Sequence, residues 1–197
     1  MENGEIVYGE SKIPKKQEKI EKVFLEPDDV EPMEEAVEAL EEADLIVLGP
    51  GSLYTSVISN LCVKGISKAL INSSAPKLYV ANVMTQPGET DGYTVKEHIN
   101  ALHRQTGQSF VDYVICCTDQ FNENVLRKYK EKNSDPVDVN VEELKQDGIE
   151  VITASNLVEI SDEHFVRHNT KVLSTLIYEK ALDLISTIQF DPNDNRK

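Results

Sequence analysis

The sequence has no tryptophan and only three cysteines among its 197 residues. Cys62 stands alone and Cys116 is adjacent to Cys117, so the odd count and the spacing favour reduced thiols over a disulfide framework. No CxxC or HxxxH spacing occurs, which argues against a metal site. We therefore expect neither a bound metal nor a resident cofactor.

Long apolar runs and positive charge are also scarce. No segment approaches the roughly 20 apolar residues that span a bilayer, and the first residues lack the pattern of a signal peptide. Lys and Arg number 20 against 35 Asp and Glu, which gives a net charge of −15. Such a chain repels a phosphate backbone. We expect a cytoplasmic protein with no membrane insertion and no nucleic-acid partner.

Short apolar runs alternate with amphipathic segments, a pattern typical of an α/β fold. The predicted strands are Ile6–Tyr8, Lys22–Leu25, Leu45–Leu48, Leu78–Val83, Tyr113–Cys117 and Glu150–Thr153. The predicted helices are Glu31–Ala43, Leu53–Asn72 with a kink near Gly65, Thr94–Arg104, Asn122–Glu131, a short one after Asn140, and Asn169–Thr187. We expect one domain over residues 1–197, a Rossmann-like three-layer sandwich with a mostly parallel sheet. Residues 1–27 could form a hairpin arm, and residues 189–197 a flexible tail.

Ligands of such folds bind at the carboxyl ends of the strands, so the residues after each strand are the informative ones. Gly49–Ser56 follows the third predicted strand and combines glycines with hydroxyl groups at a helix start. This combination could hold a phosphate without a basic residue. The alternative is an ordinary strand-to-helix turn capped by Ser52, since neither a Walker loop nor a GxGxxG fingerprint is present.

Two further segments carry polar groups at predicted element ends. Asn82 and Gln86 follow the next strand and could read the edge of a base, or could serve only to shape a turn. Arg167 precedes the final helix, where a guanidinium and a helix start together favour an anion. Thr170 would suit phosphorylation, because a phosphate there meets the same charges.

The remaining polar candidates are weaker. His98 and His103 are five residues apart on one helix and should lie on the surface. Cys116 and Cys117 are expected in the core. Asp119 follows a strand but is a lone carboxylate. No catalytic residue can be named.

The segments Ala43–Ile58 and Ala81–Thr90 resemble signature motifs of YvcK-type proteins, or gluconeogenesis factors, of the CofD-like family. Gly9-Glu10-Ser11 and Arg167-His168 also fit, so the resemblance covers essentially the whole chain. Members of this family begin with a strand and a Gly-Gly-Gly-Thr-Gly type loop that this sequence lacks. We therefore expect it to match the C-terminal portion, with a fold incomplete at the N-terminus.

The resemblance implies binding of a UDP-sugar such as UDP-N-acetylglucosamine, and a role in cell shape and wall integrity during gluconeogenic growth. It also implies wall-synthesis proteins as partners, and a homo-oligomer is possible. The candidate ligand-binding residues are Gly49, Gly51, Ser52, Tyr54, Thr55, Asn82, Gln86 and Arg167. The alternative is a CofD-like 2-phospho-L-lactate transferase, which carries a different Gly-Pro-rich loop at this position. A dinucleotide-binding domain is a third hypothesis, weakened by the absent fingerprint.

Overall fold

The computed structural model describes the main chain of residues 1–189 and is built around one parallel sheet. Four strands, β1 (Ile46–Leu48), β2 (Lys77–Val80), β3 (Tyr113–Ile115) and β4 (Glu150–Ile152), lie side by side in chain order. All three neighbouring pairs are parallel. The predicted parallel α/β sheet is therefore confirmed, and its continuous apolar strands are explained by burial on both faces.

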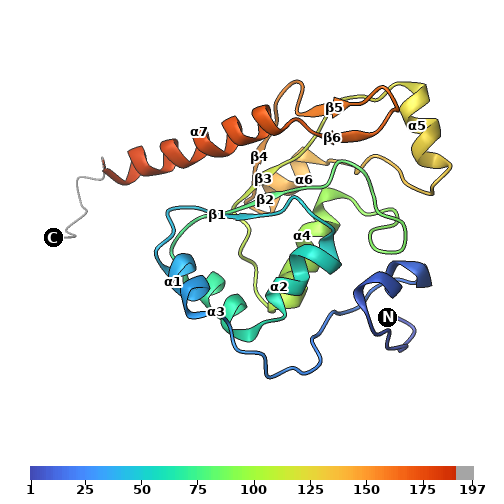
Figure 1. The fold of residues 1–197 in the computed structure, drawn as a ribbon. Coiled ribbons are helices and arrows are strands. Elements are labelled where there is room, and N and C mark those ends of the chain that lie inside the picture. The colour runs from blue at the N-terminus through green and yellow to red at the C-terminus, as the bar shows by residue number, and fades with distance from the viewer. Residues whose placement is uncertain (190–197) are drawn as a thin grey trace.

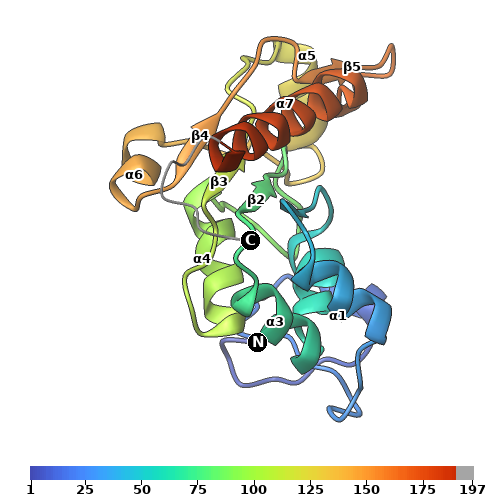
Figure 2. The same ribbon diagram turned by 90° about the vertical axis from the view of Figure 1, so that its left-hand side faces the viewer.

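Helices cover both faces of the sheet (Figures 1 and 2). One face bears α1 (Glu34–Glu41), α3 (Lys64–Asn72), α4 (Val95–Thr106) and α6 (Val141–Gln146). The other face bears α7 (Thr170–Gln189). A shorter helix, α5 (Glu123–Lys130), follows β3.

The two faces have separate cores because neighbouring residues of a strand point to opposite sides. On β2, Tyr79 joins the larger cluster beneath α3 and α4, whereas Leu78 and Val80 join the smaller cluster beneath α7. Leu173 anchors α7 in that second cluster. The far half of α7 leaves Tyr178 and Leu182 exposed.

Helix boundaries follow the capping residues seen in the sequence. Thr94 and Glu97 form the predicted capping box, in which each side chain accepts a hydrogen bond from the other residue's N–H. Gly107 ends α4 in the left-handed conformation. Asn122 and Asn140 cap α5 and α6 in the same manner as serine or threonine would.

The predicted strands Ile6–Tyr8 and Lys22–Leu25, and with them the hairpin arm over residues 1–27, are not formed. Residues 1–33 contain only two 3-10 turns, η1 (Glu10–Lys12) and η2 (Pro14–Lys16), between extended stretches. A strand needs a hydrogen-bonded neighbour, and these two stretches are separated by a cavity. Of the predicted tail, all but Gln189 lies outside the described residues.

The predicted long helix from Leu53 to Asn72 is divided into a π-helical turn η3 (Leu53–Ile58), α2 (Ser59–Leu61) and α3. The break is at Val63, whose main chain is extended. Gly65 lies in the first turn of α3, and a Cβ there would meet Pro32 Cγ at 2.4 Å. This glycine therefore serves close packing of the α1 entry on α3.

The strand predicted to be the last one is followed by an antiparallel hairpin, β5 (Val158–Ile160) and β6 (Val166–His168). The hairpin joins β4 to α7, and Asn169 N–H donates to Leu157 O at its base. No helix among the described residues has the length and apolar character needed to cross a membrane.

His98 was expected on the surface, but the structure buries it completely between Tyr79 and Tyr93. Its Nδ1 lies 2.9 Å from Thr94 O, and its Nε2 and the hydroxyl of Tyr79 have no partner within residues 1–189. His103 is half-buried, and its Nε2 accepts the N–H groups of Phe110 and Val111. The prediction that both histidines lie on the surface rested on the spacing between them. Their burial depends instead on which face of α4 packs against the sheet.

We expect the free energy of unfolding to decrease as the pH is lowered, because His98 is buried in the folded state. Burial lowers the pKa of its imidazole, an effect larger than the opposing hydrogen bond to Thr94. The unfolded chain, with an ordinary pKa near 6.5, then binds more protons in acid, so stability is lost as pH falls below about 6.5. Urea unfolding between about pH 7.5 and pH 5.5 measures this slope, which reaches at most about 1.4 kcal/mol per pH unit for one histidine.

His98→Phe should flatten the slope, since a phenyl ring fits the aromatic surroundings and does not titrate. His164→Asn is the matched control, because His164 lies in the turn before β6 with a positive φ that asparagine accepts. An unchanged pH slope in His98→Phe would exclude His98 as the cause.

Candidate functional site

The loop after β1 and the loop after β2 lie next to each other at the carboxyl edge of the sheet. This follows from the parallel register, in which Leu48 pairs with Tyr79. Gly49 has a φ of 82°, and a Cβ there would lie 3.0 Å from Val80 O. Only glycine combines this conformation with so close an approach of the two strand ends.

Polar side chains from these loops form one hydrogen-bonded row. Gln86 Nε2 donates to Ser52 Oγ at 2.9 Å, and Asn82 Nδ2 donates to Gln86 Oε1 at 3.3 Å. All three side chains are partly exposed. The amides are therefore held in fixed orientation while their remaining donors and acceptors face outward. We call Ser52, Gln86 and Asn82 the amide row.

The turn that carries Gln86 is itself tightly built. Gln86 N–H donates to Thr90 Oγ1 at 2.8 Å, and Gly88 N–H donates to Asp91 Oδ2 at 2.6 Å. Gly88 has a φ of 80°, and a Cβ there would fall 1.8 Å from Pro14 O, so the N-terminal segment packs directly on this turn. Such a turn gives the amide row a rigid support.

A buried carboxylate, Glu89, occupies the start of η3. Its Oε1 accepts Thr55 Oγ1 at 2.7 Å, and its Oε2 accepts the N–H groups of Tyr54 and Thr55 at 3.2 and 3.4 Å. Glu89 is 6% exposed. The sequence contained this residue within a recognised motif, but no pattern in it could show that the carboxylate reaches across to Thr55.

The contacts of Glu89 reduce the number of groups with which the glycine loop can bind an anion. The hydroxyl and N–H of Thr55 are already satisfied, and the Tyr54 ring is buried with its hydroxyl 2.9 Å from that of Tyr93. Burial raises the pKa of Tyr54 strongly, with a further contribution from Tyr93. Within residues 1–189 the N–H groups of Gly51, Ser52 and Leu53 have no hydrogen-bond partner. Leu53 is fully buried, so the N–H groups of the partly exposed Gly51 and Ser52 are what the loop can offer an anion.

A cavity of about 360 Å³ adjoins this loop on the side of the β1 edge. Leu48, Gly49, Gly51, Ser56 and Asn60 line part of it. This volume is within the range of small-molecule sites. The loop thus has open space on one side and the amide row on the other.

The hairpin brings β6 to the same edge. The His168 ring packs against the main chain of Ala81, the residue before Asn82. Burial lowers the pKa of His168, an effect larger than the opposing hydrogen bond that its ring donates to the main chain of Ala81, and its Nε2 is buried without a partner among the described residues. The sequence predicted Arg167 as the site residue and not His168. Because side chains alternate along a strand, only one of the two faces the sheet.

Arg167 is exposed and stands opposite Glu159 in the hairpin register. Asn169 caps α7, because its Oδ1 accepts the N–H groups of Lys171 and Val172. Thr170 is exposed in the first turn of that helix. Arg167 and Thr170 are therefore both accessible at the edge that carries the amide row.

Three further polar candidates follow β3, the strand beside β2. Cys116 is buried, as expected, and burial together with Cys117 raises the pKa of its thiol to about 12. Cys117 and Asp119 are half-buried, and burial also raises the pKa of Cys117. A thiol that stays protonated is a poor nucleophile.

Comparison with known proteins agrees with this architecture. The model of the family described as 2-phospho-L-lactate transferase CofD matches residues 1–157. The gluconeogenesis factor of Bacillus subtilis is 41% identical over 179 residues, 91% of this chain and 56% of that protein. The gluconeogenesis factor of Halalkalibacterium halodurans is 44% identical over 189 residues, 96% of this chain and 58% of that protein.

A solved structure of a protein from Bacillus halodurans has a TM-score of 0.85 and 44% identity, and covers 90% of this chain and 57% of its own. This chain thus spans a little more than half the length of these relatives. The resemblance seen in the sequence motifs is confirmed, and the chain belongs to the CofD family, with gluconeogenesis factors among its relatives.

Proposed function

We propose that this protein binds a nucleotide sugar of the UDP-N-acetylglucosamine type and acts as a regulator rather than as a catalyst. The observation that carries the proposal is the amide row, which lies beside the free N–H groups of Gly51 and Ser52. Oriented amides suit the donor and acceptor edge of a uracil base, and main-chain N–H groups suit its diphosphate. Of the candidate residues, Gly49, Gly51, Ser52, Asn82 and Gln86 are proposed to contact the ligand directly, and Arg167, exposed on β6, is proposed to pair with its diphosphate.

In this proposal Tyr54 and Thr55 act indirectly. Both are held by other residues of the chain, Tyr54 by Tyr93 and Thr55 by Glu89. They fix the shape of the loop so that the N–H groups of Gly51 and Ser52 face the ligand. Thr170, exposed near Arg167, is proposed as a phosphorylation site that would place a second anion at this edge.

The regulatory role would connect the level of the nucleotide sugar to cell shape and wall integrity during growth on gluconeogenic carbon. It draws on the names of the relatives, gluconeogenesis factors, and on the absence of any paired acid and base along the amide row. The proposed location is the cytoplasm, with wall-synthesis proteins as partners and a homo-oligomer as a possible assembly.

The second candidate is a CofD-like phosphotransferase, favoured by the family match over residues 1–157. A transferase needs a group that activates the acceptor, and Glu89 is the carboxylate nearest the loop. However, Glu89 already accepts three hydrogen bonds. Phosphorus NMR of the protein with a nucleotide-activated phospholactyl donor, a deazaflavin alcohol acceptor and magnesium separates the two functions, since only a transferase would form the new phosphodiester and release the nucleoside monophosphate.

Titration calorimetry with UDP-N-acetylglucosamine, UDP and NAD tests the binding directly. We expect saturable binding of the UDP compounds, and about tenfold weaker binding in Gln86→Ala, because two hydrogen bonds of about 0.5–1.5 kcal/mol each are removed. Gln108→Ala is the matched control, since Gln108 is exposed and lies just after the C-terminal end of α4. Tight binding of NAD with none of the UDP compounds would refute the proposal.

A further inference from the structure

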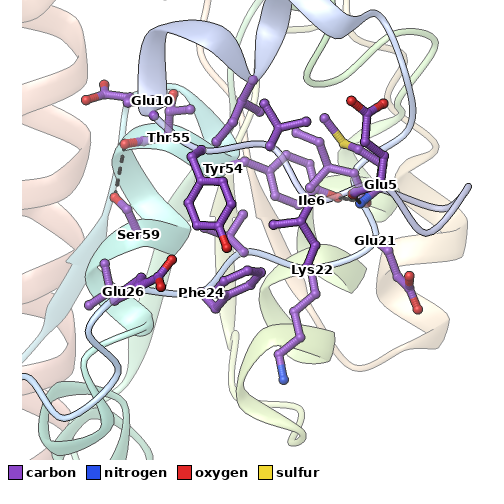
Figure 3. Close-up of a pocket in the computed structure, with 18 of the residues that line it drawn as sticks. Glu5, Ile6, Glu10, Glu21, Lys22, Phe24, Glu26, Tyr54, Thr55 and Ser59 are labelled. Atoms are coloured by element: carbon purple, nitrogen blue, oxygen red, sulfur yellow. Dashed lines mark hydrogen bonds between the residues drawn. The ribbon is translucent and has the colours of Figure 1, made fainter.

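A cavity of about 620 Å³ lies between η3 and the N-terminal segment (Figure 3). Its floor is formed by Tyr54, Thr55 and Ser59. Its walls are two extended stretches, residues 5–9 and residues 20–26. We call this space the arm groove. It lies beside η3 and does not include the amide row.

The walls of the arm groove have unused main-chain hydrogen-bonding groups. Within residues 1–189 the main chains of Ile6, Val7, Tyr8, Lys22 and Phe24 make no hydrogen bond. The same two stretches, Ile6–Tyr8 and Lys22–Leu25, have the apolar and β-branched composition that predicts strands. Two strand-forming segments with free edges on either side of a groove are suited to receive a third extended segment between them.

Apolar side chains are exposed where such a segment would lie. Ile6, Tyr8 and Phe24 are 58%, 59% and 52% exposed. In Figure 3 Ile6 and Phe24 lie close to the Tyr54 ring at the centre of the view. Exposed aromatic and aliphatic groups of this size, gathered in one place, mark an interaction surface.

The charge around the arm groove selects the partner. Glu10, Glu21 and Glu26 line the groove and are exposed, while Glu5 is already paired with Lys16. Lys22 is the one lysine or arginine of the described lining, and in Figure 3 its ammonium and the carboxylate of Glu21 both point away from the aromatic centre, which leaves Glu10 and Glu26 on the other side of the groove. A basic segment is therefore favoured, and a second copy of this chain, also at −15, is disfavoured by repulsion.

We propose that the arm groove binds an extended, basic segment of a partner protein, which adds a strand between residues 6–8 and 22–25. The main chain of the segment supplies the missing hydrogen bonds, its apolar side chains cover Ile6 and Phe24, and its basic side chains meet the three glutamates. This site shares Tyr54 and Thr55 with the support of the nucleotide-sugar loop but none of the amide row, and the proposal does not rest on nucleotide-sugar binding.

The probe is a capped heptapeptide of alternating lysine and valine, titrated by calorimetry at about 0.15 M salt, where non-specific attraction is screened. The decisive comparison is the same peptide with N-methylated valines. It has the same charge and side chains, but the valines, whose N–H groups all point to one edge of the extended peptide, can no longer donate hydrogen bonds there. We expect the methylated peptide to bind at least about tenfold more weakly. Hydrogen exchange should show new protection at residues 6–8 and 22–25 with the unmodified peptide.

Matched triple variants separate the groove from the general negative charge. Glu10→Gln, Glu21→Gln and Glu26→Gln together should weaken binding at least about tenfold, because three charge pairs are lost. Glu34→Gln, Glu35→Gln and Glu38→Gln, which remove the same charge from the exposed face of α1, should not. Equal affinities of the two peptides, equal effects of the two triples, or a dimer in sedimentation that excludes the peptide would each overturn the proposal.

Discussion

Arg167→Ala should weaken binding of UDP-N-acetylglucosamine by about 10- to 100-fold. The guanidinium fork matches the oxygens of a diphosphate, and a charge-assisted hydrogen bond contributes roughly 1.5–3 kcal/mol, with about 1.4 kcal/mol for each factor of ten. Arg167 is exposed on β6, opposite Glu159, so that its removal leaves the core intact. Titration calorimetry of the two proteins gives the ratio of dissociation constants.

Two further variants make the result specific. Arg167→Lys keeps the charge but loses the fork, and should recover only part of the affinity. Arg127→Ala removes an exposed arginine of α5, whose guanidinium contacts Asn124, and should leave binding unchanged. If Arg167→Ala folds and binds as tightly as the parent, Arg167 is not part of the site, and the N–H groups of Gly51 and Ser52 are left as the phosphate contact.

The sheet was predictable from sequence because its strands are short apolar runs, of which the central β2 is buried on both faces. Leu45–Leu48 and Tyr113–Cys117 are continuous apolar runs, and each is followed by an amphipathic helix, a sequence that folds only as a parallel crossover. The capping box of Thr94 and Glu97 fixed a helix start to the residue. These features are local, so one stretch of chain is enough to read them.

The hairpin and the N-terminal segment were mispredicted for opposite reasons. The β5 and β6 strands are only three residues long and include Glu159 and Arg167, so they have no apolar run to detect. Ile6–Tyr8 and Lys22–Leu25 have strand composition but no neighbour to pair with in the structure. Strand composition is local, whereas strand pairing is a property of the whole fold.

The position of the candidate site could be predicted from the sequence, but its hydrogen-bond network could not. The parallel order of the strands places Ser52 near Asn82 and Gln86, and the structure joins them by hydrogen bonds. The link from Glu89 to Thr55 spans 34 residues. No spacing rule predicts a contact of that kind, because it depends on how the turn at Gln86 folds back over η3.

Leu173→Ala should lower the free energy of unfolding by about 2–5 kcal/mol, the usual cost of truncating a buried leucine. Leu173 is 7% exposed and packs with Leu78, Val80 and Ile115, which makes it the anchor of α7 on its face of the sheet. Urea denaturation followed by circular dichroism measures the change.

Leu182→Ala is the matched control on the same helix, since Leu182 is 48% exposed and its truncation should change stability by less than about 0.5 kcal/mol. Equal losses in the two variants would mean that α7 is not docked through Leu173. Docking matters beyond stability, because α7 begins at Thr170, directly after His168 and Arg167. A helix loosened at Leu173 releases the hairpin that holds His168 against Ala81, so Leu173→Ala should also weaken UDP-N-acetylglucosamine binding, whereas Leu182→Ala should not.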